Sequence, residues 1–309
     1  MTPGLQRILV PLDGSPRAEQ ALRPAAELAT AAGARLVLVR TADGSHHTHL
    51  GQADHHQEQP ESYLKEVRRR FRSTGVSMDT AASRGKLPEV VLAELAHQQP
   101  DLIVMTSHGH SGPGHTPLGG VAQAVIASGE APVLLLRESS AEDVFSLRSL
   151  AGRKLLVLLD GSALAEAALP VALEVARVLN GGLILFKAVQ VYSVPYAVPT
   201  ELMTIAEADV QLAWDASFDV KEAEAYLSLV KKRLNRKAPD IAVETQVHVG
   251  ELIDQALALE SNANIGLIVM ATHGRSRLGD ALRGSTVHDM LRATPCPLLI
   301  VHPRTAPGD

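Results

Sequence analysis

The sequence predicts an α/β protein made of two similar domains in tandem. Its 309 residues suit two domains of ordinary size, and an apolar content of 46% is enough for two hydrophobic cores. Segments of the first half also return, in the same order, in the second half. In each half, short apolar runs alternate with amphipathic stretches, which is the pattern of buried parallel strands joined by helical crossovers.

The repeat consists of three pairs of matching segments. The pairs are Ile8–Ser15 with Leu155–Ser162, Leu102–Gly109 with Leu267–Gly274, and Ala131–Leu136 with Cys296–Val301. The first pair is offset by 147 residues and the other two by 165, so the second half carries 18 extra residues in its middle. Three matches in one order indicate a duplicated domain.

Five apolar runs in each half are the expected strands. They lie near Ile8–Leu12, Leu36–Val39, Val76–Ala81, Leu102–Met105 and Val133–Leu136, and near Leu155–Leu159, Leu183–Phe186, Ile241–Val247, Leu267–Met270 and Leu298–Val301. A helix is expected after the first strand of each half, where Ser15 and Ser162 can cap free N–H groups. Pro16 suits the first helical position, and apolar residues then recur at helical spacing. These are Ala18, Ala21, Leu22, Ala25 and Leu28.

The junction between the halves falls in the polar stretch Glu138–Arg153. We therefore expect an N-terminal domain over residues 1–140, a connector over residues 141–152 and a C-terminal domain over residues 153–309. Apolar residues within the stretch indicate that the connector packs against the rest of the chain.

Composition argues against several classes of protein. A net charge of −5, without a basic stripe interleaved with aromatic residues, argues against a nucleic-acid partner. No apolar run reaches the roughly 18 residues needed to cross a membrane. The single cysteine, Cys296, cannot form an internal disulfide and is expected to pack in the core, which suits a reducing, cytoplasmic compartment.

Two segments depart from the repeat. One polar loop contains a cluster of histidines, namely His46, His47, His49, His55 and His56. This loop could hold a metal such as zinc, but it has glycines and no apolar anchor, so a solvated loop without metal is the favoured interpretation. The extra length of the second half falls around Tyr192–Phe218, where it could cover a site or make an oligomer contact.

A glycine-rich loop follows the fourth expected strand of the second half. It runs over Gly274–Thr286 and leads from a buried strand into a helix. Glycines let the backbone approach a ligand closely, a helix N-terminus offers unpaired N–H groups, and Ser285 and Thr286 supply hydroxyls, so such a loop can bind phosphate. Arginines in the loop, Arg275 among them, add positive charge. Taken alone, a plain helix cap with solvated arginines explains the same residues.

The loop, together with the strand that ends in Asp160–Ser162, resembles the universal stress protein family, and the resemblance spans almost the whole chain twice. The family pattern is Gly-x2-Gly-x9-Gly-[Ser/Thr]. Ala271 stands at the first glycine, and the other elements are Gly274, Gly284 and Ser285. The resemblance implies two doubly wound domains, each with a five-stranded parallel sheet in the order 3-2-1-4-5 flanked by helices. It also implies binding of ATP, with Mg²⁺ or Mn²⁺ held through the phosphates.

The resemblance carries the nucleotide contacts of the family onto one set of residues in the second half. They are Leu158, Asp160, Ala188, Met270, Ala271, Gly274, Arg275, Gly284, Ser285 and Thr286. We expect Asp160 to contact ribose or the metal ion, although aspartate followed by glycine also suits a plain turn into the helix. Leu158 and Ala188 stand where the family has proline and valine, so looser adenine packing is expected.

The first half carries the same positions in a degenerate form. They are Pro11, Asp13, Thr41, Met105, Thr106, Gly109, Gly119 and Gly120. Thr106 replaces the first glycine of the pattern, and Gly120 replaces its hydroxyl residue. Since a helix cap tolerates glycine while the ligand loses a contact, we expect nucleotide binding to be lost in this half.

Other catalytic motifs are absent from the sequence. The pair Gly85–Lys86 lacks the pattern of a Walker loop, and neither loop has a dinucleotide fingerprint or a nucleophile elbow. His108 and His273 precede the loop glycines and are expected to position the loops. No catalytic residue is assigned, and at most slow ATP hydrolysis is expected.

Two functions remain open. In the first, the chain is a cytoplasmic ATP-binding stress-response or signalling module with an unidentified protein partner. In the second, it is a non-nucleotide interaction scaffold built on the pair of halves. The resemblance implies that the halves pack about a pseudo-twofold axis through their last strands, and that two chains associate further into a homo-oligomer.

Overall fold

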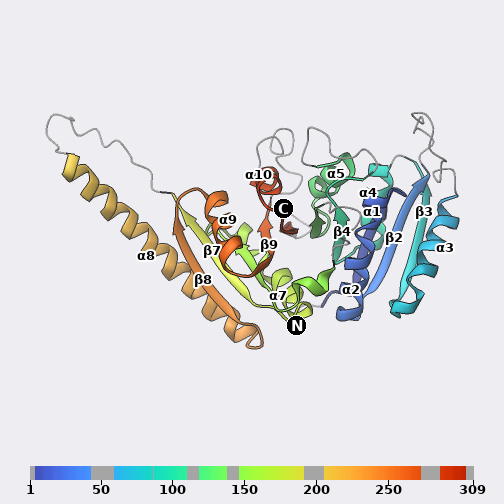
Figure 1. Cartoon of the computed structure of the whole chain (residues 1–309), viewed down its shortest axis with the longest axis horizontal. Coiled ribbons are helices and arrows are strands. Elements are labelled where there is room, and N and C mark those ends of the chain that lie inside the picture. Colours follow the sequence, from blue (N-terminus) through green and yellow to red (C-terminus); the bar gives the residue numbers. More distant parts are fainter. Residues whose placement is uncertain are drawn as a thin grey trace.

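The structure is a computed structural model of the 309-residue chain. It describes residues 4–42, 59–85, 87–109, 118–137, 146–190, 205–272 and 286–303. Strands from both halves form one ten-stranded sheet, and helices cover its two faces (Figure 1). The α/β class that the sequence predicts is confirmed.

Strands and helices of the first half alternate as expected. Their bounds are β1 Arg7–Leu12, α1 Pro16–Glu19, α2 Leu22–Ala32, β2 Arg35–Ala42, α3 Pro60–Arg70, β3 Met78–Arg84, α4 Leu87–Gln98, β4 Leu102–Thr106, α5 Gly120–Ser128 and β5 Val133–Leu136. These strands lie in the order β3-β2-β1-β4-β5 and are parallel to one another. The expected order 3-2-1-4-5 is confirmed in this half.

The second half has the same arrangement. Its elements are β6 Lys154–Leu158, α6 Ala163–Glu166, α7 Leu169–Val178, β7 Leu183–Val189, α8 Ile205–Lys237, β8 Val243–Val249, α9 Leu252–Asn262, β9 Ile265–Ala271, α10 Thr286–Ala293 and β10 Leu298–Val301. The strand order β8-β7-β6-β9-β10, with all neighbours parallel, repeats that of the first half. The domain boundaries at residues 140 and 153 stay a prediction.

The halves join through their last strands. β5 and β10 pair antiparallel, and Leu134 lies opposite Leu299. These two residues are equivalent positions of the repeat, so the joint has pseudo-twofold symmetry. The pairing gives each of the two strands a second neighbour and leaves β3 and β8 as the outer strands of the sheet.

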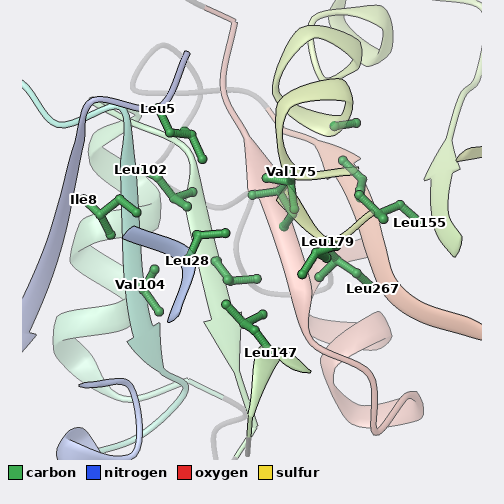
Figure 2. Close-up of a cluster of buried hydrophobic side chains, with 14 of the residues drawn as sticks. Leu5, Ile8, Leu28, Leu102, Val104, Leu147, Leu155, Val175, Leu179 and Leu267 are labelled. Carbon is green, nitrogen blue, oxygen red and sulfur yellow. The ribbon is translucent and has the colours of Figure 1, made fainter. Parts of the chain in front are cut away.

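Alternate residues of the central strands pack on opposite faces of the sheet. In β1, Ile8 belongs to the hydrophobic cluster beneath α2 and α7, whereas Leu9 belongs to the cluster beneath α5 and α10. The first cluster contains residues of both halves, among them Leu28 of α2 and Leu179, the residue that follows α7 (Figure 2). Since α2 and α7 are also in contact, the hydrophobic core continues from one half into the other.

The described part of the connector packs on α2. A 3₁₀ helix, Leu147–Leu150, lies against α2 with its two leucines buried. Glu27 of α2 accepts hydrogen bonds from the Ser146 hydroxyl at 2.8 and 2.9 Å and from the Leu147 backbone N–H at 2.8 Å. The expected packing of the connector is therefore confirmed from Ser146 onward, and residues 138–145 lie outside the described residues.

The helix expected after the first strand is divided in both halves. α1 ends at Glu19 and α2 begins at Leu22, and α6 and α7 are separated in the same way. Pro24 and Pro170 lie in the first turn of the second helix of each pair. Because proline has no N–H, it cannot continue the hydrogen bonds of the preceding helix. The apolar spacing hid this break, since residues on both sides of it face one core.

The extra length of the second half extends a helix. α8 has 33 residues, whereas its counterpart α3 has 11. The C-terminal part of α8 packs on β7 and β8, and its N-terminal part extends away from the sheet (Figure 1). Residues 191–204 lie outside the described residues.

Candidate functional site

The carboxyl end of β6 is the place where a sheet of this topology binds ligands. β6 lies between β7 and β9, so the strand order reverses at this point. In open α/β sheets, ligands bind at the carboxyl ends of the strands beside such a switch point. Asp160 and Gly161 follow β6 here, and Met270 and Ala271 end the neighbouring strand β9. The structure thus brings together the predicted residues of β6 and β9.

A tight turn connects β6 to α6. The Asp160 oxygen Oδ1 accepts a hydrogen bond from the backbone N–H of Ser162 at 2.8 Å, and the Ser162 hydroxyl oxygen accepts one from the N–H of Ala165 at 3.1 Å. Gly161 has a φ of +100°, which residues with side chains rarely adopt. Ser162 therefore caps α6, as the sequence predicts. Asp13–Ser15 form the same turn in the first half.

Asp160 supplies an exposed negative charge at this turn. Partial burial alone would raise its pKa, but hydrogen bonds from Ser162 and the charge of Lys187 hold the pKa of Asp160 below its ordinary value. An ionised carboxylate at the end of a sheet can accept hydrogen bonds from sugar hydroxyls or bind a cation. The geometry therefore suits the ribose or metal contact expected of Asp160.

The predicted adenine contacts are mainly part of the core. Leu158 and Met270 are 6% and 5% exposed and belong, with the half-buried Ala188, to the cluster beneath α9 and α10. Ala271 is half-buried and packs on the opposite face of the sheet. Ala188 and Ala271 therefore keep accessible surface at the site, whereas Leu158 and Met270 keep very little.

Most of the predicted phosphate loop lies outside the described residues. This holds for Gly274, Arg275, Gly284 and Ser285. Thr286 is the first residue of α10 and is exposed. α10 thus begins at the end of the loop, where the sequence places a helix.

At the equivalent place in the first half, two of the predicted residues contact neighbouring groups of the protein. The Thr106 hydroxyl donates a hydrogen bond to the backbone carbonyl of His108 at 2.7 Å. A Cβ atom on Gly109 would lie 2.1 Å from Oδ2 of Asp13, so this carboxylate occupies the space beside Gly109. Asp13 is half-buried, whereas Asp160 is exposed. The aspartate of the first half is therefore the less exposed of the two.

Gly119 and Gly120 form the start of α5. The N–H of Gly119 donates to the carbonyl of Ser107 at 2.8 Å, which ties this helix to the end of β4. A Cβ atom on Gly120 would meet nothing within 4 Å, so the missing hydroxyl residue would find room there. The remaining predicted residues of this half lie in strands, Pro11 in β1, Thr41 in β2 and Met105 in β4.

His108 supports the close packing of this loop. It is buried, its Nδ1 lies 3.3 Å from the Ser107 hydroxyl oxygen, and its Cδ2 lies 3.8 Å from the place of a Cβ on Gly119. These contacts agree with the positioning role expected for His108. His273, its counterpart, lies outside the described residues.

A basic side chain lies beneath the turn of each half, which the sequence reasoning missed. In the first half, Arg40 of β2 is 4% exposed and stacks on the ring of Tyr63 at 3.8 Å from its centroid. A Cβ on Gly14 would lie 2.7 Å from its Nη2. Glu19 accepts hydrogen bonds from the Tyr63 hydroxyl at 2.7 Å and from Arg70 at 2.9 Å. Burial, and then Glu19, raise the pKa of Tyr63.

The second half repeats this cluster with a lysine. Lys187 of β7 donates from Nζ to the carbonyl oxygen of Asp160 at 2.9 Å and lies 5.3 Å from the ring centroid of Tyr226. Glu166 pairs with Arg233, and burial together with Glu166 raises the pKa of Tyr226. The sequence held a signal for this cluster, because Lys187 is a charged residue in an apolar strand and lies 147 residues after Arg40, the offset of the first repeat.

No group of three or more His, Cys, Asp and Glu side chains within the described ranges could hold a metal ion. The histidines at positions 46, 47, 49, 55 and 56 lie outside those ranges. The described helices include none that is long and apolar enough to span a membrane. Cys296 packs in the core as expected, and burial, followed by the nearby Glu260, raises the pKa of its thiol to about 12.

Comparison with known protein families gives a match over most of the chain. A model described as the universal stress protein family matches residues 4–137 and, a second time, residues 152–302. The curated proteins contain no match to the chain.

Two of the solved structures that match the chain share its fold over almost its whole length. A universal stress protein from Archaeoglobus fulgidus is 19% identical with a TM-score of 0.66, over 96% of this chain and 98% of that one. A protein from Pseudomonas aeruginosa described as functionally unknown is 15% identical with a TM-score of 0.65, over 97% of this chain and 93% of that one. A universal stress protein family protein from Arabidopsis thaliana with AMP bound matches 44% of this chain and 94% of its own length, at 16% identity and a TM-score of 0.33.

Proposed function

The chain belongs to the universal stress protein family, and we propose that it is a stress-response or signalling module that binds ATP mainly in its C-terminal half. Bound ATP would stabilise one conformation and so change which surface a protein partner can contact. Hydrolysis would be slow at most. A lone buried cysteine, Cys296, suits a cytoplasmic place of action.

The Asp160 turn is the observation that carries this proposal. It lies at the switch point of a parallel sheet, where ligands of such folds bind. Its carboxylate is exposed, has a lowered pKa and is held in place by the N–H of Ser162. Those properties fit an acceptor for the two ribose hydroxyls of a nucleotide. Ala188 and Ala271, which keep accessible surface, would border the adenine.

The sequence of the following loop supplies what the phosphates need. Gly274, Gly284 and Ser285 match the phosphate pattern of the family, and Arg275 adds positive charge. Thr286, exposed at the start of α10, would add a hydroxyl donor. A Mg²⁺ or Mn²⁺ ion would be held through the phosphates, where it neutralises their charge.

The first half differs at the points that a nucleotide would use. Gly120 has no hydroxyl, and the Thr106 hydroxyl is engaged with the carbonyl of His108. The Asp13 carboxylate lies close to Gly109 and is half-buried, whereas Asp160 is exposed. These differences support a division in which the second half binds ATP and the first half has a structural role.

A second function, an interaction scaffold that binds no nucleotide, is favoured by the continuity of the two halves. The β5–β10 pairing and the shared core join the two halves into one continuous unit. Such an object can present surfaces to partners whether or not a ligand is bound.

Isothermal titration of Mg-ATP into nucleotide-stripped protein tests the proposal with a matched pair of variants. Asp160→Ala should weaken binding at least about 10-fold, because a hydrogen bond to a charged group contributes about 1.5–3 kcal/mol. Asp13→Ala, which removes the equivalent bond to Ser15, should leave the affinity unchanged. Gly284→Val should abolish binding.

The control variant makes the outcome decisive, because both changes remove an aspartate from the same kind of turn. An equal effect of the two substitutions would contradict the division between the halves. No heat of binding from the unaltered protein, with AMP and ADP tried as well, would replace the nucleotide proposal by the scaffold.

A further inference from the structure

A histidine of the outer strand β8 lies beside a residue that is proposed to border the adenine. β8 lies next to β7 at the end of the sheet (Figure 1), and His248 of β8 is paired in register with Ala188 of β7. The His248 ring lies edge-on to the ring of Phe186, with 5.5 Å between their centroids. Because Phe186 and Ala188 lie on the same face of the sheet, His248 lies on that face as well. It is half-buried, so part of its ring keeps accessible surface.

His248 is also nearly level with Asp160. Leu158 of β6 pairs with Phe186 of β7, so Asp160 continues this register about level with Ala188. Asp160, Ala188 and His248 thus lie at the carboxyl ends of three neighbouring strands. At about 4.8 Å per strand, His248 lies about 10 Å from Asp160, on the far side of Ala188. That arrangement suits a nucleoside whose ribose lies at Asp160 and whose base extends over Ala188.

Gln255 of α9 fixes the orientation of the His248 ring. Oε1 of Gln255 lies 3.2 Å from Nδ1 of His248. The amide lies close against the turn between β8 and α9, because a Cβ atom on Gly250 of this turn would lie only 2.9 Å from Nε2 of Gln255. Gly250 has a φ of +131°, a conformation that favours glycine. The turn therefore leaves room for the side chain that holds the histidine.

This contact determines which ring nitrogen of His248 carries the proton. An amide oxygen only accepts hydrogen bonds, so Nδ1 donates to Gln255, and Nε2 of the neutral ring is an acceptor. The two nitrogens point in different directions, so Nε2 points away from Gln255. Within the described part of the chain, Nε2 receives no hydrogen bond. His248 therefore presents an oriented acceptor that a ligand beside Ala188 can use.

The first half has neither side chain of this pair. Ser83 of β3, which is paired in register with Thr41 of β2, stands at the position of His248, and Val90 stands at that of Gln255. Both positions keep the repeat offset of 165 residues. The fold common to the two halves thus forms without the pair. Its occurrence in the half that is proposed to bind ATP favours a role in binding.

We propose that His248 recognises the base of the bound nucleotide, with Nε2 accepting a hydrogen bond from the exocyclic amino group of adenine. This inference rests on the proposed binding of ATP in the second half and names a residue that determines base specificity there. Guanine carries a carbonyl oxygen where adenine carries the amino group, so it would place two acceptors against each other. A site built around a hydrogen bond rejects a ligand that leaves its polar group unpaired. His248 thus selects adenine over guanine nucleotides, and Gln255 is a positioning residue that acts through His248.

Equilibrium dialysis of nucleotide-stripped protein with three labelled ligands tests this role. The ligands are ATP, GTP and the triphosphate of purine riboside, which lacks the amino group. The unaltered protein should bind ATP at least about 10-fold more tightly than either of the others. His248→Phe keeps an aromatic ring but removes the acceptor, so it should weaken ATP binding at least about 10-fold and leave binding of the purine riboside triphosphate unchanged. Ser83→Ala is the matched control in the first half and should keep the preference for ATP.

Gln255→Leu tests the positioning role. Without its partner, the neutral His248 ring can carry the proton on Nε2 and donate to the carbonyl oxygen of guanine. ATP binding should therefore weaken while GTP binding strengthens, an effect that a loss of packing would not produce. Nitrogen-15 NMR of the histidine ring measures the same change without any ligand. The proton should lie on Nδ1 in the unaltered protein and move toward Nε2 in the variant.

The outcomes separate this proposal from the proposed function. A preference for ATP that survives His248→Phe, or that Ser83→Ala removes equally, would overturn base recognition by His248 and leave nucleotide binding in place. A proton on Nε2 in the unaltered protein would contradict the oriented acceptor. If none of the three triphosphates binds, the proposed function fails, and base recognition fails with it.

Discussion

Alanine at Gly14 and at Gly161 should destabilise the protein by clearly different amounts, although the two glycines occupy equivalent turns. Both have a positive φ, +86° and +100°, so a Cβ costs about 1–2 kcal/mol at either position. The difference comes from the basic side chain beneath each turn. At Gly14 a Cβ would lie 2.7 Å from Nη2 and 3.0 Å from Cζ of Arg40, and at Gly161 it would lie 3.2 Å from Nζ of Lys187.

The Arg40 side chain cannot move aside easily, because it is 4% exposed and stacked on Tyr63. Displacing it would sacrifice a desolvated cation–π contact of about 2 kcal/mol. Lys187 is half-buried with a flexible ammonium end, so it can shift at the loss of at most one hydrogen bond, about 1 kcal/mol. With the same backbone cost at both positions, Gly14→Ala should therefore cost about 1–2 kcal/mol more than Gly161→Ala, about 3–4 kcal/mol against about 1–3 kcal/mol.

Urea unfolding followed by circular dichroism measures both losses. Gly120→Ala, where a Cβ meets open space, is the control and should be neutral or slightly stabilising. Adding Arg40→Met should remove most of the excess cost at Gly14, since the clash is then absent. Equal losses at the two glycines, or no relief from Arg40→Met, would refute the reasoning.

Three further predictions concern the connector and two buried side chains. Glu27→Ala should cost about 1–3 kcal/mol in urea unfolding, because the Ser146 hydroxyl and the Leu147 N–H lose their acceptor, while Glu27→Gln should cost less. Burial lowers the pKa of His302, so the unfolded chain takes up a proton more readily than the folded chain. The free energy of unfolding should therefore decrease as the pH falls below about 6.5. His302→Gln should reduce this decrease between pH 7.5 and 5.5. Cys296, with a pKa of about 12, should react with a thiol reagent only in urea, and prompt reaction of the native protein would contradict its burial.

The sequence revealed the strands because a parallel sheet buries them on both faces. Each strand therefore stands out as an apolar run, and the duplication marks equivalent runs twice, as at Leu134 and Leu299. Strand order and the joint through the last strands followed from the family resemblance and are confirmed. Apolar spacing could not show where α1 ends, since it records which face a residue occupies and not whether the backbone hydrogen bonds continue.

The candidate site was only partly accessible from the sequence. Asp160 and its turn could be predicted, because the turn is formed by consecutive residues of the sequence. The cluster of Arg40, Tyr63 and Glu19 joins a strand and two helices, and no local pattern connects such distant positions. Its counterpart at Lys187 uses a different cation, so only the repeat offset links the two.

The number of ATP molecules bound per chain at saturation tests the central claim most directly. Equilibrium dialysis of nucleotide-stripped protein against labelled ATP and Mg²⁺ gives this number without assuming a binding heat. We predict one molecule per chain, held by the half that contains Asp160. Two molecules per chain would contradict the proposal that the first half binds no nucleotide, and none would contradict nucleotide binding by this protein altogether.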